Sequence, residues 1–552
     1  MRDRSVCSLR DIRRVNSLFL WFFNSREAVG TYQSVIESIT LALAQCYYYR
    51  LNVEQRFMYG NAIQQKLVEK SQQHIEFEQT VEQEQWRYVR KLDVSPGIAL
   101  NLAFRENLFV ILVALATKTP TIVVGRPGSS KTLAMATLQA NLASSSKNKA
   151  LTQMGFDDFF VVSFQCSKLT TADLIKKRWE IAVSFRERLE QLKTDFCLFV
   201  CIRSVCVCVC MTRENENIGK KKKKKKKRLS EDDRQKTPLN KGKEQANKSV
   251  VLVLDEVGLA EQSKHRPLKV LHQLLEEEDR KIAFIGLSNW KLDAAKMNRV
   301  VLHQVMQPNQ KELEQTAQEI ISSGEETPAS CVLVAKIPQM ASLYDSIMKD
   351  HDSSPFKFDF FGYRDFYSLC SYLKYCVEIR KDVSKDVLIE AVMRNFGGMT
   401  KEQTESFLFP KISKNLLDGD LLNGEDIWET YSPLRLIDDN IRQTRMDNPP
   451  SNEMRNIMLI TESPFMWKVL FDKGIASPES TDVIFGSKFA GDIDSTVYLY
   501  RTIEKVRTAM SAGRLCLLLK LEQLYDSLYD VLNQRYQVVD GQKCVYFLFL
   551  YS

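Results

Sequence analysis

The stretch that most constrains this chain is Thr121–Leu142, TIVVGRPGSSKTLAMATLQANL. A short apolar run is followed by a glycine turn, a Lys-Thr pair and a segment with helical spacing. Gly125–Thr132 matches the phosphate-binding loop pattern G-x-x-x-x-G-K-[ST], except that Ser130 stands where a glycine is usual. The order of strand, loop and helix predicts an α/β fold with a parallel sheet.

The residue types of this loop suit the phosphates of a nucleotide. Glycines let the backbone bend so that successive N–H groups point at the phosphates, and the helix N-terminus adds its positive dipole end. Lys131 would neutralise phosphate charge, and the Thr132 hydroxyl would bind Mg²⁺. The alternative is an ordinary turn that contains the same residue types. The predicted phosphate contacts come from Gly125, Pro127, Gly128, Ser129, Ser130, Lys131 and Thr132.

A second apolar run, Val250–Glu256, reads VVLVLDE and ends in two carboxylates. A buried parallel strand would deliver both to the carboxyl edge of the sheet, where open α/β sheets bind ligands. Asp255 would complete the Mg²⁺ shell, and Glu256 would polarise the attacking water. An apolar run ending in Asp-Glu is common on strands. The prediction therefore depends on the presence of the phosphate-loop pattern in the same chain.

Three further polar residues complete the predicted site. Asn289 ends the apolar run Lys281–Trp290 and could reach the water or the γ-phosphate; the alternative is an Asn in a strand-terminal turn. Arg299 follows a short helix and could reach a neighbouring unit's nucleotide as an arginine finger, or it is an exposed helix-end arginine. Arg364 opens a helix of the smaller domain and could fold back on the phosphates.

Composition excludes some classes of partner. The formal net charge is +8, but Lys220–Arg228 supplies nine positive charges, so the rest of the chain is close to neutral and no nucleic-acid partner is expected. Five of the 13 cysteines fall within residues 196–249, and the other eight show no CxxC spacing for zinc and no secreted disulfide framework, which indicates a reducing, intracellular setting. The apolar run Leu18–Phe23 is too short to span a bilayer, and no transmembrane segment is expected.

The chain divides into four parts on these patterns. Residues 1–93 read as helical, 94–315 as the nucleotide-binding domain, 316–430 as a helical domain, and 431–552 as the start of another unit with a strand over Asn456–Ile460. Residues 196–249 interrupt the second part with alternating Val-Cys and a lysine run. We expect this segment to be disordered. It is either translated non-coding sequence or a lineage-specific loop.

The order of these parts resembles the AAA+ ATPases: phosphate loop, Asp-Glu strand, Asn-terminated strand, trailing arginine and helical lid. Longer strings such as GRPGSSKT, VLVLDEVGLAEQSKHRPLKVLHQLLE and GLSNWKLDAAKMNR are similar to the mysterin-like giant ring-finger AAA+ E3 ubiquitin ligases. The resemblance covers most of the chain outside 196–249. It implies tandem AAA+ units in one chain, an ATP loop at Gly125–Thr132, a hydrolytic pair at Asp255 and Glu256, and Asn289 as the sensor.

The same resemblance implies that Arg299 and Arg364 are the finger and lid arginines. Residues 1–93 would be the lid of a preceding unit, and 431–552 a degenerate second AAA+ unit. That unit has Thr461-Glu462-Ser463 where a phosphate loop would begin and Lys520-Leu521-Glu522 near the expected acidic pair. No ring-type Cys/His cluster is visible, so the chain would be the motor part of a ligase.

These patterns predict a module that binds and hydrolyses Mg-ATP to drive conformational change. Its partners would be neighbouring AAA+ units and, through a parent protein, the ubiquitin machinery. The implied location is the cytoplasm, with association to lipid droplets. Two alternatives stay open: a scaffold that binds nucleotide without hydrolysing it, and an inert product of a faulty gene model.

Overall fold

The structure is a computed structural model. The residues that it describes are 8–25, 31–71, 76–194, 248–276, 281–323, 327–350, 361–420, 422, 424–444, 456–463, 465–493, 495–521, 524–525, 527–532, 537–539 and 542–544. The predicted insertion therefore lies outside the described residues except for its last two positions. Lys248 and Ser249 belong to strand β3, so the insertion ends earlier than the sequence suggested.

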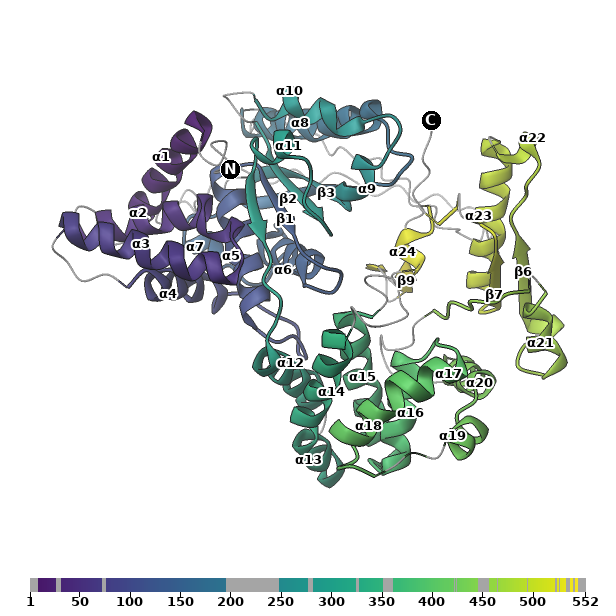
Figure 1. Cartoon of the computed structure of the whole chain (residues 1–552). Coiled ribbons are helices and arrows are strands. Elements are labelled where there is room, and N and C mark those ends of the chain that lie inside the picture. The colour runs from purple at the N-terminus through teal and green to yellow at the C-terminus, as the bar shows by residue number, and fades with distance from the viewer. Residues whose placement is uncertain are drawn as a thin grey trace, which may run out of the picture.

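A five-stranded parallel sheet forms the centre of the nucleotide-binding domain (Figure 1). Its strands lie in the order β2-β3-β4-β1-β5. Because every crossover returns in the same direction, all carboxyl ends meet at one edge. The bounds are β1 (Thr121–Val124), β2 (Asp158–Gln165), β3 (Lys248–Asp255), β4 (Ala283–Ser288) and β5 (Val301–Gln304). This confirms the predicted α/β class.

Helices cover both faces of this sheet, which explains why its strands are apolar without alternation. Helix α5 is enclosed, with 12 of its 16 residues buried, so it is a core helix and not an amphipathic surface one. The helices of this domain are α5 (Leu102–Thr117), α6 (Lys131–Leu142), α7 (Ala150–Gln153), α8 (Ala172–Thr194), α9 (Val257–Glu261), α10 (Val270–Leu274) and α11 (Ala294–Met297), with a 3₁₀ turn η3 (Pro267–Lys269).

The N-terminal residues are helical, as predicted, and pack directly against the nucleotide-binding domain. Phe22, Tyr49 and Tyr88 belong to the same buried cluster as Phe109 on α5 and Leu138 on α6. The described N-terminal helices thus share one core with the sheet. The elements are α1 (Leu9–Asn24), α2 (Tyr32–Cys46), η2 (Tyr48–Arg50), α3 (Val53–Ser71) and α4 (Phe77–Val89).

The helical domain has its own core, built around Tyr344, Phe366 and Phe396. Its first helix begins at Gln310, six residues before the boundary expected from the sequence, and its packing extends past residue 430 to Leu436. The elements are α12 (Gln310–Ser322), α13 (Pro328–Ala335), α14 (Ile337–Lys349), α15 (Tyr363–Tyr375), η5 (Cys376–Arg380), α16 (Lys385–Phe396), α17 (Lys401–Gln403), η6 (Thr404–Leu408), α18 (Phe409–Asn415), α19 (Gly424–Thr430) and α20 (Pro433–Thr444).

The C-terminal part contains a small parallel pair, β6 with β7, and an antiparallel pair, β8 with β9. The strand predicted over Asn456–Ile460 is wrong: these residues form no strand, and Met458 is 81% exposed. The elements are α21 (Trp467–Asp472), η7 (Pro478–Ser480), β6 (Thr481–Phe485), α22 (Ala490–Ile493), α23 (Thr496–Ser511), β7 (Leu515–Leu519), α24 (Tyr529–Leu532), β8 (Gln537–Val539) and β9 (Gln542–Cys544).

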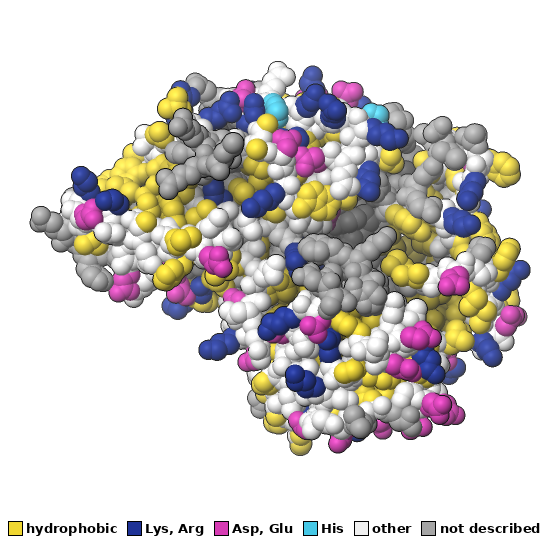
Figure 2. Space-filling view, in the orientation of Figure 1, with side chains coloured by type: hydrophobic (Ala, Val, Ile, Leu, Met, Phe, Trp, Pro, Cys, Tyr) yellow, Lys and Arg dark blue, Asp and Glu magenta, His cyan; other side chains and the backbone are white. Residues whose placement is uncertain are grey.

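Two surface properties bear on the expected partners. None of the helices in the described residues is long and apolar enough to cross a membrane. Figure 2 shows several Lys and Arg side chains along the upper part of the visible face, with some acidic side chains among them, and acidic and basic side chains interspersed over the lower part.

Candidate functional site

The loop between β1 and α6 adopts backbone conformations that demand small residues. Gly128 has φ +83°, and Ser130 takes φ +58° in the left-handed region although it carries a side chain. Ser130 stands where the phosphate-loop pattern has glycine, so the conformation is retained without it. A Cβ on Gly125 would lie 2.6 Å from Ser129 Oγ and 2.8 Å from Val305 Cβ, which leaves no room for a larger residue there.

Lys131 begins α6 and its side chain turns back into the loop. Its Nζ donates to the carbonyl oxygens of Gly125 at 2.6 Å and Arg126 at 3.1 Å, and to Asn289 Oδ1 at 3.0 Å. Burial lowers the pKa of Lys131 to about 8, while the charges of Glu256 and Asp255 oppose this shift. The buried ammonium group would therefore interact favourably with the negative charges of a bound polyanion. Thr132 lies in the same first turn, half-buried.

The two predicted carboxylates lie at the end of β3. Asp255 is 9% exposed, and its Oδ1 accepts a hydrogen bond from the Glu256 backbone N–H at 2.9 Å. Glu256 has φ +52°, a left-handed conformation that places it outside the strand direction. Burial raises the pKa of Glu256, and the neighbouring Asp255 charge adds to this effect. Both groups therefore lie at the carboxyl edge of the sheet.

Asn289 joins the lysine to the glutamate. Its Oδ1 accepts from Lys131, and its Nδ2 donates to Glu256 Oε2 at 2.7 Å. This pattern fixes the orientation of the amide, because the ammonium can only donate and the carboxylate can only accept. β4 delivers Asn289 beside β1 and β3, since it pairs with both.

Arg364 comes from the helical domain and also lies at the site. A Cβ on Gly128 would lie 3.2 Å from the Arg364 backbone nitrogen and 3.3 Å from its Cγ. The start of α15 therefore contacts the loop directly. The positive charge of Arg364 adds slightly to the lowering of the Lys131 pKa by burial, and it opposes the rise of the Glu256 pKa that burial causes.

Arg299 lies apart from these residues. Its Nε donates to Glu276 Oε1 at 3.2 Å, and its Nη1 donates to the Ala295 carbonyl at 2.6 Å. Arg10 of α1 shares the same Glu276 oxygen at 2.7 Å. The structure thus brings together every predicted site residue except Arg299, whose role toward a neighbouring unit stays a prediction.

One residue that contacts the loop, Asn107, was not predicted from the sequence. Asn107 on α5 is fully buried, and its Nδ2 donates to the Ser129 carbonyl at 2.9 Å. The signal available in the sequence was the polar pair Glu106-Asn107, which together with Arg105 separates the apolar runs 102–104 and 108–116 of α5. Charged and amide side chains are seldom fully buried without a partner, so such a pair indicates a specific contact.

The residues present fit a magnesium nucleotide. The hydroxyl and carboxylate oxygens of Thr132 and Asp255 are the ligand types that Mg²⁺ prefers. The Lys131 ammonium turns back into a tight, partly left-handed loop, and such loops offer their backbone N–H groups to phosphate oxygens. Among the described residues, no group of three or more His, Cys, Asp and Glu side chains is arranged to hold a metal ion by itself.

The C-terminal unit repeats part of this geometry with different chemistry. β7 pairs in parallel with β6 as β3 does with β2, and Leu519 and Asp255 are the last residues of the equivalent strands. The next residues, Lys520 and Glu256, have φ +55° and +52°. A cation thus occupies the position at which the first unit has its carboxylate.

Comparison with known proteins agrees with this geometry. Residues 97–207 and 221–312 match the RNF213 AAA domain, and residues 446–548 match a second model with the same description. The human E3 ubiquitin-protein ligase RNF213 is 30% identical over 98% of this chain. The mouse RNF213 and the zebrafish rnf213-beta are each 28% identical over 98% of the chain. The chain spans about 10% of the length of these relatives.

Proposed function

The chain belongs to the RNF213 (mysterin) family of AAA-domain proteins, and from this premise we propose that its first unit is a magnesium-dependent ATPase. The observation that carries this proposal is the convergence of Lys131, Glu256 and Asn289 in one hydrogen-bonded chain beside Asp255 and the phosphate loop. AAA domains imply nucleotide binding in general. The more specific proposal, hydrolysis, rests on the Glu256 carboxylate, which accepts a hydrogen bond from Asn289 in this series of contacts.

Binding would exchange one set of Lys131 contacts for another. Nζ now donates to two loop carbonyls and to Asn289. Phosphate oxygens are stronger acceptors because they carry charge, so the ammonium would turn to the β- and γ-phosphates. Thr132 and Asp255 would hold Mg²⁺, which neutralises charge on the phosphates when bound. Arg364, at the start of α15, would add a second cation from the lid.

Hydrolysis would then depend on Glu256 and Asn289. Glu256 would accept a proton from a water aligned with the γ-phosphate, and its raised pKa suits a group that must take up a proton near neutral pH. Asn289 Nδ2 holds one Glu256 oxygen, so the other oxygen would face the water. Movement of Arg364 with the nucleotide state would pass the change to the helical domain.

A second candidate is a scaffold that binds nucleotide without turnover. One observation favours it: Glu256 Oε2 accepts a hydrogen bond from Asn289 Nδ2 at 2.7 Å, so this oxygen is engaged by the protein and not by a water. Comparison of binding with turnover separates the two candidates.

The functions of a whole ligase are proposals for this chain, since it covers a tenth of its relatives. We propose that the unit works in the cytoplasm beside neighbouring AAA units and that its motion serves a ubiquitin ligase. Arg299 would reach a neighbouring unit's nucleotide after release from Glu276. Lipid-droplet association is a further proposal that depends on the family alone.

Equilibrium binding of Mg-ATP to the full chain tests the binding step. Wild type should saturate with one nucleotide per first unit, and Lys131→Ala should weaken binding at least about 100-fold, since it removes a charge-assisted contact in a buried site. Asn141→Leu is a matched control, because Asn141 is buried in the same domain but binds the Asp93 carbonyl. Equal affinity in wild type and Lys131→Ala would refute the proposed site.

A further inference from the structure

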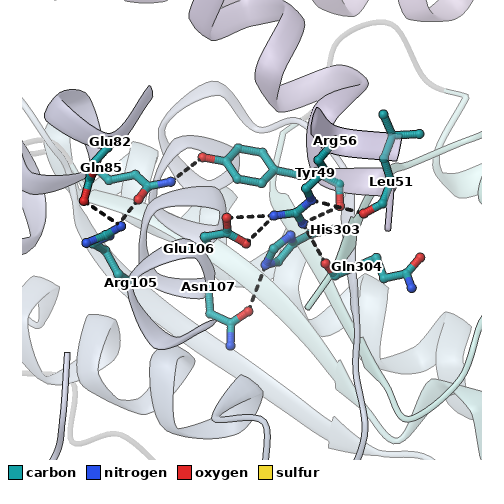
Figure 3. Close-up of polar contacts among 10 residues, drawn as sticks. All are labelled: Tyr49, Leu51, Arg56, Glu82, Gln85, Arg105, Glu106, Asn107, His303 and Gln304. Carbon is teal, nitrogen blue, oxygen red and sulfur yellow. Dashed lines mark hydrogen bonds and ion pairs between the residues drawn. The ribbon is translucent and has the colours of Figure 1, made fainter. Parts of the chain in front are cut away.

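A buried amide, Asn107, contacts both the phosphate loop and β5. Figure 3 shows its contact with His303 of β5. Asn107 donates from Nδ2 to the Ser129 carbonyl at 2.9 Å, and its Oδ1 lies 2.9 Å from His303 Nε2. Asn107 and His303 are both 0% exposed. Neither side chain belongs to the phosphate-loop pattern.

The donor and acceptor roles along the contacts of Ser129, Asn107 and His303 follow from the chemistry of these groups. The Ser129 carbonyl can only accept, so the amide nitrogen of Asn107 must face it and Oδ1 must face His303. Oδ1 needs a donor, and therefore His303 carries its proton on Nε2. Burial lowers the pKa of His303 well below its usual value, and Arg56 adds to this effect, which keeps the ring neutral.

The contact at Ser129 also sets the direction of the next N–H group. In a trans peptide the carbonyl of one residue and the N–H of the following residue point in opposite directions. Fixing the Ser129 carbonyl toward α5 therefore turns the Ser130 N–H away from α5. Ser130 is the residue held at φ +58°, so the anchored peptide is also the strained one.

The helix that carries Asn107 is itself held at the adjacent residue. Glu106 accepts two hydrogen bonds from Arg56 Nη1, at 2.8 and 2.9 Å. Arg56 Nη2 donates at 2.9 Å to the carbonyl of Gln304, next to His303. Arg56 belongs to α3 of the N-terminal helices, so α3, α5 and β5 form one buried polar junction behind the loop (Figure 3).

We propose that Asn107 is a positioning residue for nucleoside triphosphate binding: it fixes the Ser129–Ser130 peptide so that the Ser130 N–H faces the phosphates. His303 orients Asn107, and the Arg56–Glu106 pair holds α5 at the required depth. This inference rests on the proposed ATP site and adds a residue from outside the phosphate-loop pattern to it.

The test compares two buried asparagines in the full chain. Asn107→Leu removes both contacts and should raise the Kd for Mg-ATP by about 10- to 100-fold, as loss of a supporting contact behind a site commonly does. KM should rise by a similar factor, with a smaller change in kcat. Asn141→Leu should lower thermal stability by a comparable amount and leave the Kd within about threefold. A folded Asn107→Leu variant with wild-type Kd would overturn the inference.

Two variants of His303 keep the test decisive if Asn107→Leu does not fold. His303→Leu removes the donor to Asn107 and should weaken Mg-ATP binding by about fivefold or more, whereas His303→Gln can donate from its amide and should restore most of the affinity. Unchanged affinity in His303→Leu would contradict the inference. Absence of binding in wild type would instead refute the ATP site, so the two failures are distinguishable.

Discussion

Asn289 Nδ2 donates a hydrogen bond to Glu256 Oε2 at 2.7 Å, and this contact holds the proposed base at the end of β3. The same amide accepts from Lys131 at 3.0 Å. A single side chain thus links the group that would bind phosphate to the group that would activate water. Nucleotide that draws Lys131 away would leave Asn289 bound to Glu256 alone.

Asn289→Ala should therefore separate binding from turnover. Loss of the amide leaves Glu256 without its orienting donor, and kcat should fall by about 10²- to 10³-fold, the range for removal of a positioned polar group. The Kd for Mg-ATP should change by less than about tenfold, because phosphate contacts come from the loop. Steady-state kinetics beside equilibrium binding measure both values. A larger loss in binding than in kcat would contradict this role.

Ser130→Gly should stabilise the protein. Glycine adopts φ +58° without the steric cost that a side chain pays there, so the free energy of unfolding should rise by about 0.5–1 kcal/mol. Nucleotide affinity should be retained, since the loop pattern is then complete. Ser130→Ala, which keeps the Cβ, is the matched control and should show no gain in thermal or denaturant unfolding. An equal gain in both variants would exclude backbone strain as the cause.

Nucleotide affinity should depend on pH through Lys131. Burial lowers the pKa of Lys131 to about 8 in the free protein, so the ammonium is charged below pH 8 and increasingly neutral above it. Phosphate binding favours the charged form; hence above pH 8 binding must take up a proton, and the Kd should rise by up to about tenfold per pH unit.

Calorimetry in buffers of different ionisation enthalpy would measure this proton uptake. We expect about half a proton per nucleotide at pH 8 and much less at pH 6.5. A Kd that stays flat from pH 7 to 9.5, with no proton uptake, would show that Lys131 is charged throughout and that its environment is less desolvating than the structure indicates.

Replacement of one partner of the Arg56–Glu106 ion pair should lower the free energy of unfolding substantially. Both side chains are nearly enclosed, at 4% and 3% exposed, and removal of either partner leaves a buried charge alone. Arg56→Met or Glu106→Gln should each lower the free energy of unfolding by about 3–5 kcal/mol. The double variant should lose clearly less than the sum of the two. Additive losses in denaturant unfolding would show that the two charges do not stabilise each other.

The nucleotide loop and its carboxylates were predictable because their signals are local. Residue types at fixed spacing in Gly125–Thr132 and Val250–Glu256 determine both the strand ends and the chemistry. Asn289 followed from the same rule for strand ends. Arg364 was proposed to reach the phosphates because it opens a helix of the smaller domain, and the structure places it against Gly128.

The contacts that the sequence did not predict join residues far apart in the chain. Asn107 meets Ser129 and His303, and no local pattern encodes a partner so distant. The core shared by the N-terminal helices and α5 also joins residues far apart in the chain, so no local pattern predicts it. Asn456–Ile460 shows the converse: an apolar run favours a strand, but a strand also needs a neighbouring edge to pair with, and local propensity does not supply one.

Steady-state hydrolysis of Mg-ATP by the full chain tests the central claim most directly. Wild type should turn over, whereas Glu256→Gln should bind Mg-ATP with wild-type affinity and lose at least about 10²-fold in kcat, because the amide cannot accept the proton of the attacking water. Lys520→Gln is the matched control in the second unit and should leave turnover unchanged. Tight binding with no turnover in wild type, or full turnover in Glu256→Gln, would contradict the account.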